Sequence, residues 1–280
     1  MKQLSSPSIG LAAAILAGCS PTSDPVPPQN SRSDASGTPA STAAPPAFEG
    51  RWIITAFDGK PSASAPEGNR RPTDLSIMPS NYGANAGCNS LFGIAVFHEG
   101  RYYTQPGPPT LLSCGEIVNA QEAVLSRVMR ASPAVIFAGD SGATLQGGGH
   151  SLSLRRVSDD KAPVTNAAPM LKGKRIELLA VDGRYLPQSR QITSSFIDFD
   201  DEEWRATADC GTLSGTWRQS GWVIEASSKS ASKDCGADSV IDAGIRSALS
   251  SHARFSMGPN GEFIMAGSGH WISGAYVAPE

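Results

Sequence analysis

The sequence predicts an α+β protein made of two tandem repeats, each a curled antiparallel β sheet (a partial barrel) with one packed helix. Two long segments share landmarks in the same order, short apolar stretches end at glycine-containing turns, and each segment holds one stretch of helical period. The chain has 280 residues, of which 29 are Gly and 21 are Pro, and this composition favours short strands and turns over long helices.

The landmarks of the repeat keep their order and nearly their spacing along the chain. The offset between matching residues is 123 for the opening pair, 124 for the Asp-Gly pair, and 122, 121 and 120 for the last three pairs. Such self-similarity predicts one supersecondary unit used twice, as a domain at 48–157 and a more divergent domain at 171–280, joined by a polar linker at 158–170. The matching landmarks are Phe48-Glu49-Gly50 with Leu171-Lys172-Gly173, Asp58-Gly59 with Asp182-Gly183, Cys88 with Cys210, Cys114 with Cys235, and His150 with His270.

Six strands and one helix are expected in each repeat, in matching order. The helix of the first repeat follows Ser113-Cys114-Gly115-Glu116, which has the spacing of a capping box, and that of the second follows Asp238 or Ser239. The apolar helix faces are Ile117, Val118, Val124, Leu125, Val128 and Met129 in the first repeat, and Ile241, Ile245, Ala248 and Leu249 in the second. The strands are expected at 51–57, 75–78, 94–97, 101–104, 134–137 and 151–157, then at 174–181, 195–199, 215–218, 222–225, 254–257 and 271–277.

The first 19 residues predict a lipoprotein signal peptide. Lys2 precedes a short apolar stretch, and the segment ends Leu16-Ala17-Gly18-Cys19, which resembles the bacterial lipobox. We expect Cys19 to carry the lipid (diacylglycerol and palmitate-like chains) and 20–47, rich in Pro, Ser and Ala, to be a disordered tether. The expected location is the cell envelope, on the periplasmic side of the outer membrane, because Ser20 rather than Asp follows the cysteine. An ordinary secretory signal is the alternative.

The first repeat resembles the META/HslJ-like family of bacterial envelope proteins. The residues that carry the resemblance are Gly50-x-Trp52, Gly87-Cys88-Asn89 followed by Gly93, and Thr110-Leu-Leu-Ser-Cys114. The resemblance implies a secreted or lipid-anchored curled sheet with a helix, no established catalytic activity, and links to heat shock, envelope stress and drug tolerance. The second repeat departs from the pattern, with Arg175 at the position of the opening Trp, Gly211 in place of Asn and Ala231 in place of Thr110.

Four cysteines remain for pairing: Cys88, Cys114, Cys210 and Cys235. An exported protein sits in an oxidising compartment, so we expect disulfides. Of the three connectivities, the repeat favours Cys88–Cys114 and Cys210–Cys235. Reduced structural thiols and a metal site are the alternatives, and the sequence has no CxxC motif that would favour metal.

No catalytic motif is recognisable in the sequence. The pattern at His98–Tyr102 is expected to be a solvated hairpin, the three glycines at 147–149 a hairpin turn, and the acidic run at 198–203 a charged turn rather than a weak Ca²⁺ site. The repeated His150 and His270 fit either strand positions or a pH-sensitive binding site. Trp217, Trp222 and Trp271 fit core packing or, with the two histidines, a candidate ligand surface.

These observations predict a non-enzymatic envelope lipoprotein that binds an envelope protein or a lipophilic small ligand, or supports the envelope under stress. We expect no cofactor and no metal. Nucleic acid is not an expected partner, because the formal net charge is −3. The alternative hypothesis is a hydrolase-type enzyme with an unrecognised site at the junction between the repeats.

Overall fold

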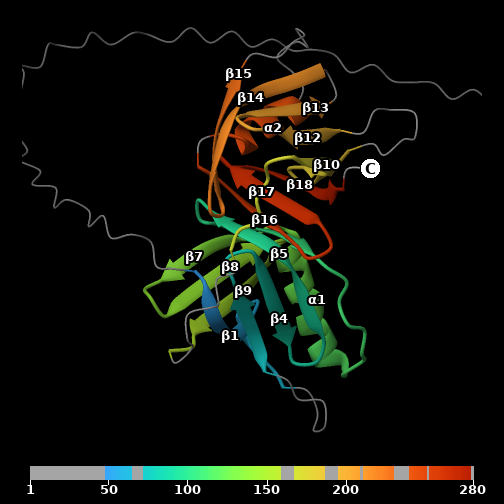
Figure 1. Cartoon of the computed structure of the whole chain (residues 1–280). Helices are drawn as coiled ribbons and strands as arrows, with labels where there is room; N and C mark the ends of the chain where they lie inside the picture. Colours follow the sequence, from blue (N-terminus) through green and yellow to red (C-terminus); the bar gives the residue numbers. More distant parts are fainter. Residues whose placement is uncertain are drawn as a thin grey trace, which may run out of the picture. The chain divides into compact units, whose positions relative to one another are not determined.

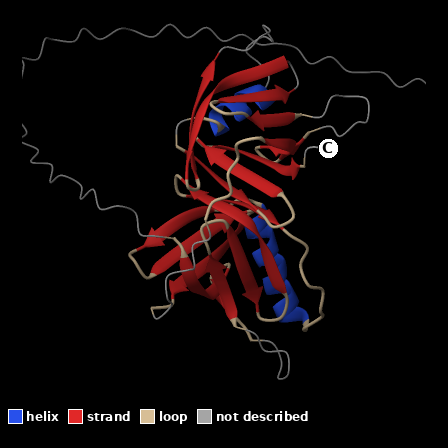
Figure 2. Ribbon diagram, viewed as in Figure 1, coloured by secondary structure: helices blue, strands red, loops and turns tan. Residues whose placement is uncertain are grey.

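The computed structural model describes residues 48–64, 72–158, 167–186, 195–208, 211–229, 240–250 and 252–278. The signal peptide and Cys19, the tether, most of the linker, Cys210, Cys235 and the two candidate caps of the second helix, Asp238 and Ser239, lie outside these ranges. Strands dominate the described residues, and one helix accompanies each set of strands (Figure 2). The protein is therefore mostly β.

The first module comprises the described residues of 48–158 and forms a closed antiparallel barrel. Strand β1 pairs with β3 on one side and with β9 on the other, so the sheet closes on itself, and the short β2 extends β1. The expected partial barrel is thus wrong in this respect. The elements, most of which are labelled in Figure 1, are β1 Gly50–Phe57, β2 Lys60–Pro61, β3 Thr73–Ile77, β4 Asn81–Ala86, β5 Ser90–His98, β6 Arg101–Pro106, α1 Glu116–Arg130, β7 Ala134–Ala138, β8 Gly142–Gly147 and β9 His150–Arg156.

The second module comprises the described residues of 167–278 and has the same topology. Strand β10 pairs with β12 and β18 and closes a second barrel, and the short β11 extends it. Its elements are β10 Lys174–Val181, β11 Arg184–Tyr185, β12 Phe196–Phe199, β13 Glu203–Ala208, β14 Gly211–Ser220, β15 Val223–Lys229, α2 Val240–Ala248, β16 Ala253–Met257, β17 Glu262–Gly267 and β18 His270–Val277.

Local irregularities recur at matching places in the two modules, which supports the duplication. The register of β1 against β9 shifts between Ile54 and Ala56, and that of β10 against β18 shifts between Leu178 and Ala180. The turn residue after each of these first strands, Asp58 or Asp182, has a φ of 50° and is followed by a glycine with a φ of 75°. An L-residue in this left-handed region is tolerated best when it is Asp or Asn, so the Asp-Gly sequence suits both turns.

The matching bulges also correct the alignment of the first strands. Arg51 binds Asp74 with a nitrogen–oxygen distance of 3.0 Å, and Arg175 binds Asp198 at 2.7 Å. Arg175 is therefore the counterpart of Arg51, and the buried Ile176 is the counterpart of Trp52. The expectation that Arg175 replaces the opening tryptophan is wrong by one residue, because the segment between Leu171 and β10 is one residue longer than its counterpart.

The side chains of each module fill its own barrel. Trp52, Leu75, Tyr82, Tyr102 and Leu145 are fully buried in the first core, and a separate buried cluster fills the second. The described core residues thus fill the barrel interiors with side chains, as in other small barrels.

Helix α1 lies against β1, β4, β6, β8 and β9 and adds Leu125, Val128 and Met129 to the first core. Its predicted apolar face is wrong at Ile117, which is 69% exposed. The predicted capping box is also absent: Gly115 is the N-cap residue, and no side chain caps the helix. Instead, the side chain of Asn119 accepts a hydrogen bond from the backbone N–H of Cys114 at 3.1 Å.

Besides the short β2 and β11, two strands per module were missing from the sequence prediction, and they are the ones that complete the barrels. Strand β4 reads NYGANA and β8 reads GATLQG, and small residues of this kind have low β propensity. Both strands lie under α1, where there is little room: a Cβ on Gly147 would lie 3.1 Å from the Cβ of Ala131. The close approach of the helix thus favours small residues in these strands, and for that reason the sequence pattern did not indicate them. Strands β13 and β17 are their counterparts in the second module.

The two modules belong to one compact unit and are in contact with each other. Strands β5 and β6 pack against β16 and β17, and a small apolar cluster joins them, made of Ile94, Val96 and Tyr103 with Ile264, Ala266 and Trp271. The hydroxyl of Ser256 also donates a hydrogen bond to the carbonyl of Ser80. In the part of the chain that the structure covers, no helix is long and apolar enough to cross a bilayer.

Gly93→Ala should destabilise the protein, whereas Gly83→Ala should not. A Cβ on Gly93 would lie against the carbonyl oxygen of Gln105 and 2.9 Å from the Cα of Pro106, and both are backbone atoms of the neighbouring strand. We expect a loss of about 1–3 kcal/mol in the free energy of unfolding, as for other overpacked sites. Gly83 on the adjacent strand has nothing within 4 Å of its Cβ position, so Gly83→Ala is the matched control. Equal urea midpoints for the two variants would contradict this packing.

Candidate functional site

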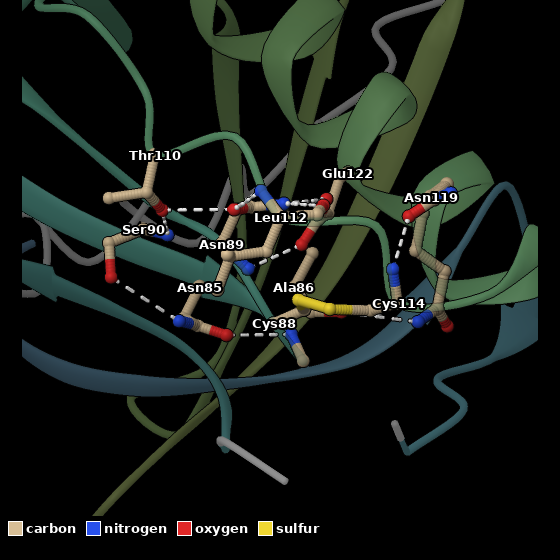
Figure 3. The surroundings of a disulfide bond; sticks show 12 residues. Asn85, Ala86, Cys88, Asn89, Ser90, Thr110, Leu112, Cys114, Asn119 and Glu122 are labelled. Carbon is tan, nitrogen blue, oxygen red and sulfur yellow. Dashed lines mark hydrogen bonds between the residues drawn. A yellow bond between two sulfur atoms is a disulfide. The ribbon is translucent and has the colours of Figure 1, made fainter. Parts of the chain in front are cut away.

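A disulfide joins Cys88 to Cys114 in the first module, as predicted. The Cα atoms are 6.2 Å apart, and both cysteines are buried beside Val118 of α1. The bond ties the turn between β4 and β5 to the residue before the helix (Figure 3). In the chain-entropy model, closing this loop contributes about 3.5 kcal/mol. The residues of the predicted Cys210–Cys235 disulfide lie outside the described residues.

The side-chain amide of Asn89 organises the segment between β6 and α1. Its oxygen accepts hydrogen bonds from the backbone N–H of Leu112 at 2.8 Å and from the hydroxyl of Thr110 at 3.0 Å. Its nitrogen donates to the carbonyl of Leu112 at 2.8 Å and to the carboxylate of Glu122 at 2.7 Å. An asparagine amide has two donor hydrogens and two acceptor lone pairs, so its bonding capacity is fully used.

The neighbouring groups complete this network. The second oxygen of the Glu122 carboxylate accepts from the backbone N–H of Asn89 at 2.5 Å, so α1 holds both ends of that residue. The hydroxyl of Thr110 accepts from the N–H of Ser90 at 2.9 Å. Figure 3 shows these bonds converging on Asn89 beside the disulfide. The segment is thus fixed to β5 and to α1 without any secondary structure of its own.

This network leaves two leucines facing solvent. Leu111 is 88% exposed and Leu112 is 58% exposed, and both belong to the segment 107–113, which we call the leucine loop. A pocket of about 450 Å³ lies between this loop and α1, with Leu91, Pro109, Leu112 and Leu125 among the residues that line it. With the exposed Ile117 nearby in the chain, the loop forms an apolar surface on a rigid support.

The leucine loop has no matching support in the second module. Gly211 stands at the position of Asn89 and has no side chain to bond with, and the counterpart of the loop lies outside the described residues. The two modules therefore share the barrel and differ in the residue at the position of Asn89.

The repeated histidines fasten a turn in each module. Nδ1 of His150 lies 2.8 Å from an oxygen of Asp58, and Nδ1 of His270 lies 2.8 Å from Asp182. The other oxygen of each aspartate accepts the N–H of the residue after the histidine, at 2.8 Å and 2.9 Å. Each pair thus joins the turn after the first strand to the start of the last strand.

In the first module the histidine does not have the arrangement of a catalytic base. Nε2 of His150 lies 3.1 Å from a guanidinium nitrogen of Arg127. Arginine can only donate, so Nε2 accepts this bond and Nδ1 carries the proton that is given to Asp58. The lone pair that would remove a proton from a nucleophile is therefore occupied. Within the described ranges, no hydroxyl or thiol hydrogen-bonds to either imidazole.

The structure separates the residues of the candidate ligand surface. Trp217 lies in the second core, where its indole N–H binds the carbonyl of Asp200. Trp271 packs on Tyr103 between the modules, with ring centroids 6.2 Å apart. Trp222 packs against Phe255 and lines a different cavity. His150 and His270 belong to the turns of separate modules.

The acidic run at 198–203 is bound to basic side chains. Asp198 pairs with Arg175, Asp201 with Lys172 at 2.6 Å, and Glu203 with Lys229 at 2.9 Å. Asp198 belongs to β12 and Glu203 begins β13, so only Asp200, Asp201 and Glu202 form the charged turn. Across the residues that the structure covers, no group of three potential ligands is placed to hold a metal ion.

The sequence pointed to Asn89, Thr110 and the cysteines but not to Glu122 or Asn119. Both lie on the polar side of a helix, where an acid or amide is ordinary, and nothing in their spacing links them to Asn89. Asp58 and Asp182 were noted only as turn residues. Their recurrence before each repeated histidine was the available signal for the pairing.

Comparison with known proteins gives a family match and similarity to solved structures. Residues 46–159 match the model of the META domain family. A solved structure described as the NMR structure of the protein from Burkholderia xenovorans is 19% identical, with a TM-score of 0.32. That alignment covers 43% of this chain and 97% of the other. A search of curated proteins found no match.

Asp58→Asn should lower stability at neutral pH but not in acid. The hydrogen bonds from His150 and from the N–H of Ser151 hold the pKa of Asp58 below its ordinary value of 3.8. The ionised carboxylate therefore stabilises the fold above that value, and the contribution is lost as the pH falls through the lower, folded-state pKa. The difference at pH 7 should be below about 1 kcal/mol, because the side chain is partly exposed. Urea unfolding from pH 7 to pH 2 measures it, with Asp140→Asn on an exposed turn as control. A difference that persists undiminished at pH 2 would contradict this assignment.

Proposed function

We propose, from the META domain at residues 46–159, that the chain is a non-enzymatic, lipid-anchored binding module of the bacterial envelope. The leucine loop is the surface through which it engages a partner with a complementary apolar patch. The observation that carries the proposal is the exposure of Leu111 and Leu112 on a support that uses the whole hydrogen-bonding capacity of Asn89.

If the exposed leucines lay in a mobile loop, binding a partner would carry the entropic cost of ordering that loop. Here the order exists before binding, because the disulfide, Glu122 and Thr110 already fix the loop. Preorganisation of this kind raises affinity without new contacts. A rigid apolar patch beside a pocket is also the arrangement that interface anchors need.

The arrangement gives less support to the hydrolase alternative. The side chains of Asn89 and Thr110 form hydrogen bonds to backbone groups, and Nε2 of His150 is bound to Arg127. A general base needs an unoccupied lone pair within reach of the proton that it removes. We therefore place the activity of the chain in binding, in line with a supporting role under envelope stress.

The membrane anchor is the second part of the proposal. The lipobox-like segment ending at Cys19 and the Pro-, Ser- and Ala-rich residues 20–47 support a lipid-held body on a tether. Two or more acyl chains give stable anchoring where one gives only marginal binding.

Cys19→Ala should move the protein from the membrane to the soluble periplasmic fraction, because the thioether that carries the lipid cannot form. Fractionation of cells that express the full chain, followed by immunoblotting, measures the shift. Retention of the variant in the membrane at the wild-type level would contradict lipidation at this residue.

Replacing both loop leucines should abolish partner capture without unfolding the protein. We expect Leu111→Ser with Leu112→Ser to reduce recovery of crosslinked partners at least tenfold, since the exposed side chains contribute little to the core. The melting temperature should change by no more than about 2 °C. The measurement is crosslinking of the full chain in intact cells, followed by mass spectrometry.

The matched control is Ile136→Ser, which removes another exposed aliphatic side chain from β7 of the same module. Its recovery of partners should equal that of the unaltered chain. The proposal is overturned if the leucine variant recovers the same partners in the same amounts, or if the unaltered chain recovers nothing above background.

A further inference from the structure

A second cavity lies where the two modules meet, apart from the leucine loop. It has a volume of about 280 Å³, and we call it the intermodule cavity. The first module contributes the ends of β3 and β5, and the second contributes Trp222, Arg254 and Phe255. All these residues belong to the same compact unit of the chain.

The wall of the intermodule cavity is mainly aromatic. Phe48, Phe97 and Tyr102 form the wall on one side, with ring centroids of Phe48 to the other two at 5.3 Å and 5.2 Å. On the other side, Trp222 and Phe255 lie with centroids 5.5 Å apart. A small pocket with apolar walls and a few polar groups is the usual form of a small-molecule site.

Arg254 supplies a cation to this apolar space. Its guanidinium lies 3.5 Å from the carbonyl of Phe97, which is the one hydrogen bond that the described residues give its side chain. Arginine has five donor hydrogens, so most of its bonding capacity remains for a ligand. A planar guanidinium matches a carboxylate through two parallel hydrogen bonds.

The charged groups near Arg254 leave it available. Burial lowers the pKa of His98, and the charges of Arg254 and His252 act in the same direction. The neutral form of this imidazole is therefore favoured, and it offers Arg254 no negative charge. Glu99 interacts with His98 through a nitrogen–oxygen distance of 3.6 Å and is itself exposed. Glu49 is the acidic residue that lines the cavity. Its negative charge would repel the anionic group of a ligand, which would favour a position of that group nearer to Arg254.

The corresponding place in the second module is closed. Gln219 stands at the position of Phe97, and its side chain binds the N–H of Leu171 at 3.0 Å and the carbonyl of Pro169 at 2.8 Å. The amide thus holds the incoming segment over the barrel end where the first module has an aromatic wall.

We propose that the intermodule cavity binds a small aromatic monocarboxylate, with the ring between Phe97 and Trp222 and the carboxylate on Arg254. This site does not depend on the leucine loop or on the lipid anchor. A ligand bound there contacts both the end of the first barrel and β16 of the second module, so binding also stiffens the contact between the modules.

Titration of the full chain with 3-phenylpropanoate and with its uncharged amide tests the proposal. Isothermal titration calorimetry should show one saturable site, with the acid bound at least tenfold more tightly than the amide. Arg254→Gln should weaken the acid at least tenfold and leave the amide within twofold. Glu49→Gln should tighten the acid, because it removes a like charge.

The control variant is Arg184→Gln, which removes an exposed arginine far from the cavity residues in the sequence and should leave both affinities unchanged. Melting curves establish that each variant is folded. Absence of saturable binding of the acid, equal affinity for acid and amide, or an Arg254→Gln variant that binds the acid normally would each overturn the proposal. If Arg254→Gln does not fold, a Glu49→Gln variant with unchanged affinity for the acid overturns it.

Discussion

Closure of each sheet by pairing its first strand with its last is the constraint on which the rest of the structure depends. Once β1 meets β9 and β10 meets β18, each barrel interior is completed and filled by residues of that module. Barrels of this size are either filled by side chains or hold one small ligand, and the interiors of these two are filled by core side chains. The two proposed sites are the leucine loop and the intermodule cavity, whose wall includes Phe48, Ile77 and Tyr102 at the end of the first core.

The two modules show which residues the barrel needs and which it does not. The paired Arg51–Asp74 and Asp58–His150 recur as Arg175–Asp198 and Asp182–His270, because they hold the strands and the turn that close the sheet. Asn89, which supports the leucine loop of the first module, does not recur, because Gly211 stands at its position. The duplicated scaffold thus leaves its outer segments free to diverge.

Much of the fold could be predicted from the sequence, because the duplication is visible in residues that serve the scaffold. The first and last strands, the Asp-Gly turns and the Cys88–Cys114 bond were all accessible, since each depends on local pattern or on the repeat. Closure was not, because β4 and β8 carry small residues whose selection by the helix above them is a tertiary effect. The same is true of Glu122, whose role depends on the position of α1 relative to Asn89, and of Arg254, which meets the cavity only through contact between modules.

Amide hydrogen exchange of the folded full chain, followed residue by residue by NMR, tests most directly whether a closed barrel carries a loop that Asn89 holds rigid with its leucines exposed. The amide of Leu112, which donates to Asn89, should exchange slowly, at rates close to those of the β1–β9 pairs, whereas that of Leu111 should exchange fast. Fast exchange at Leu112 would show a loop without this support, and fast exchange along β1 and β9 would show an open sheet.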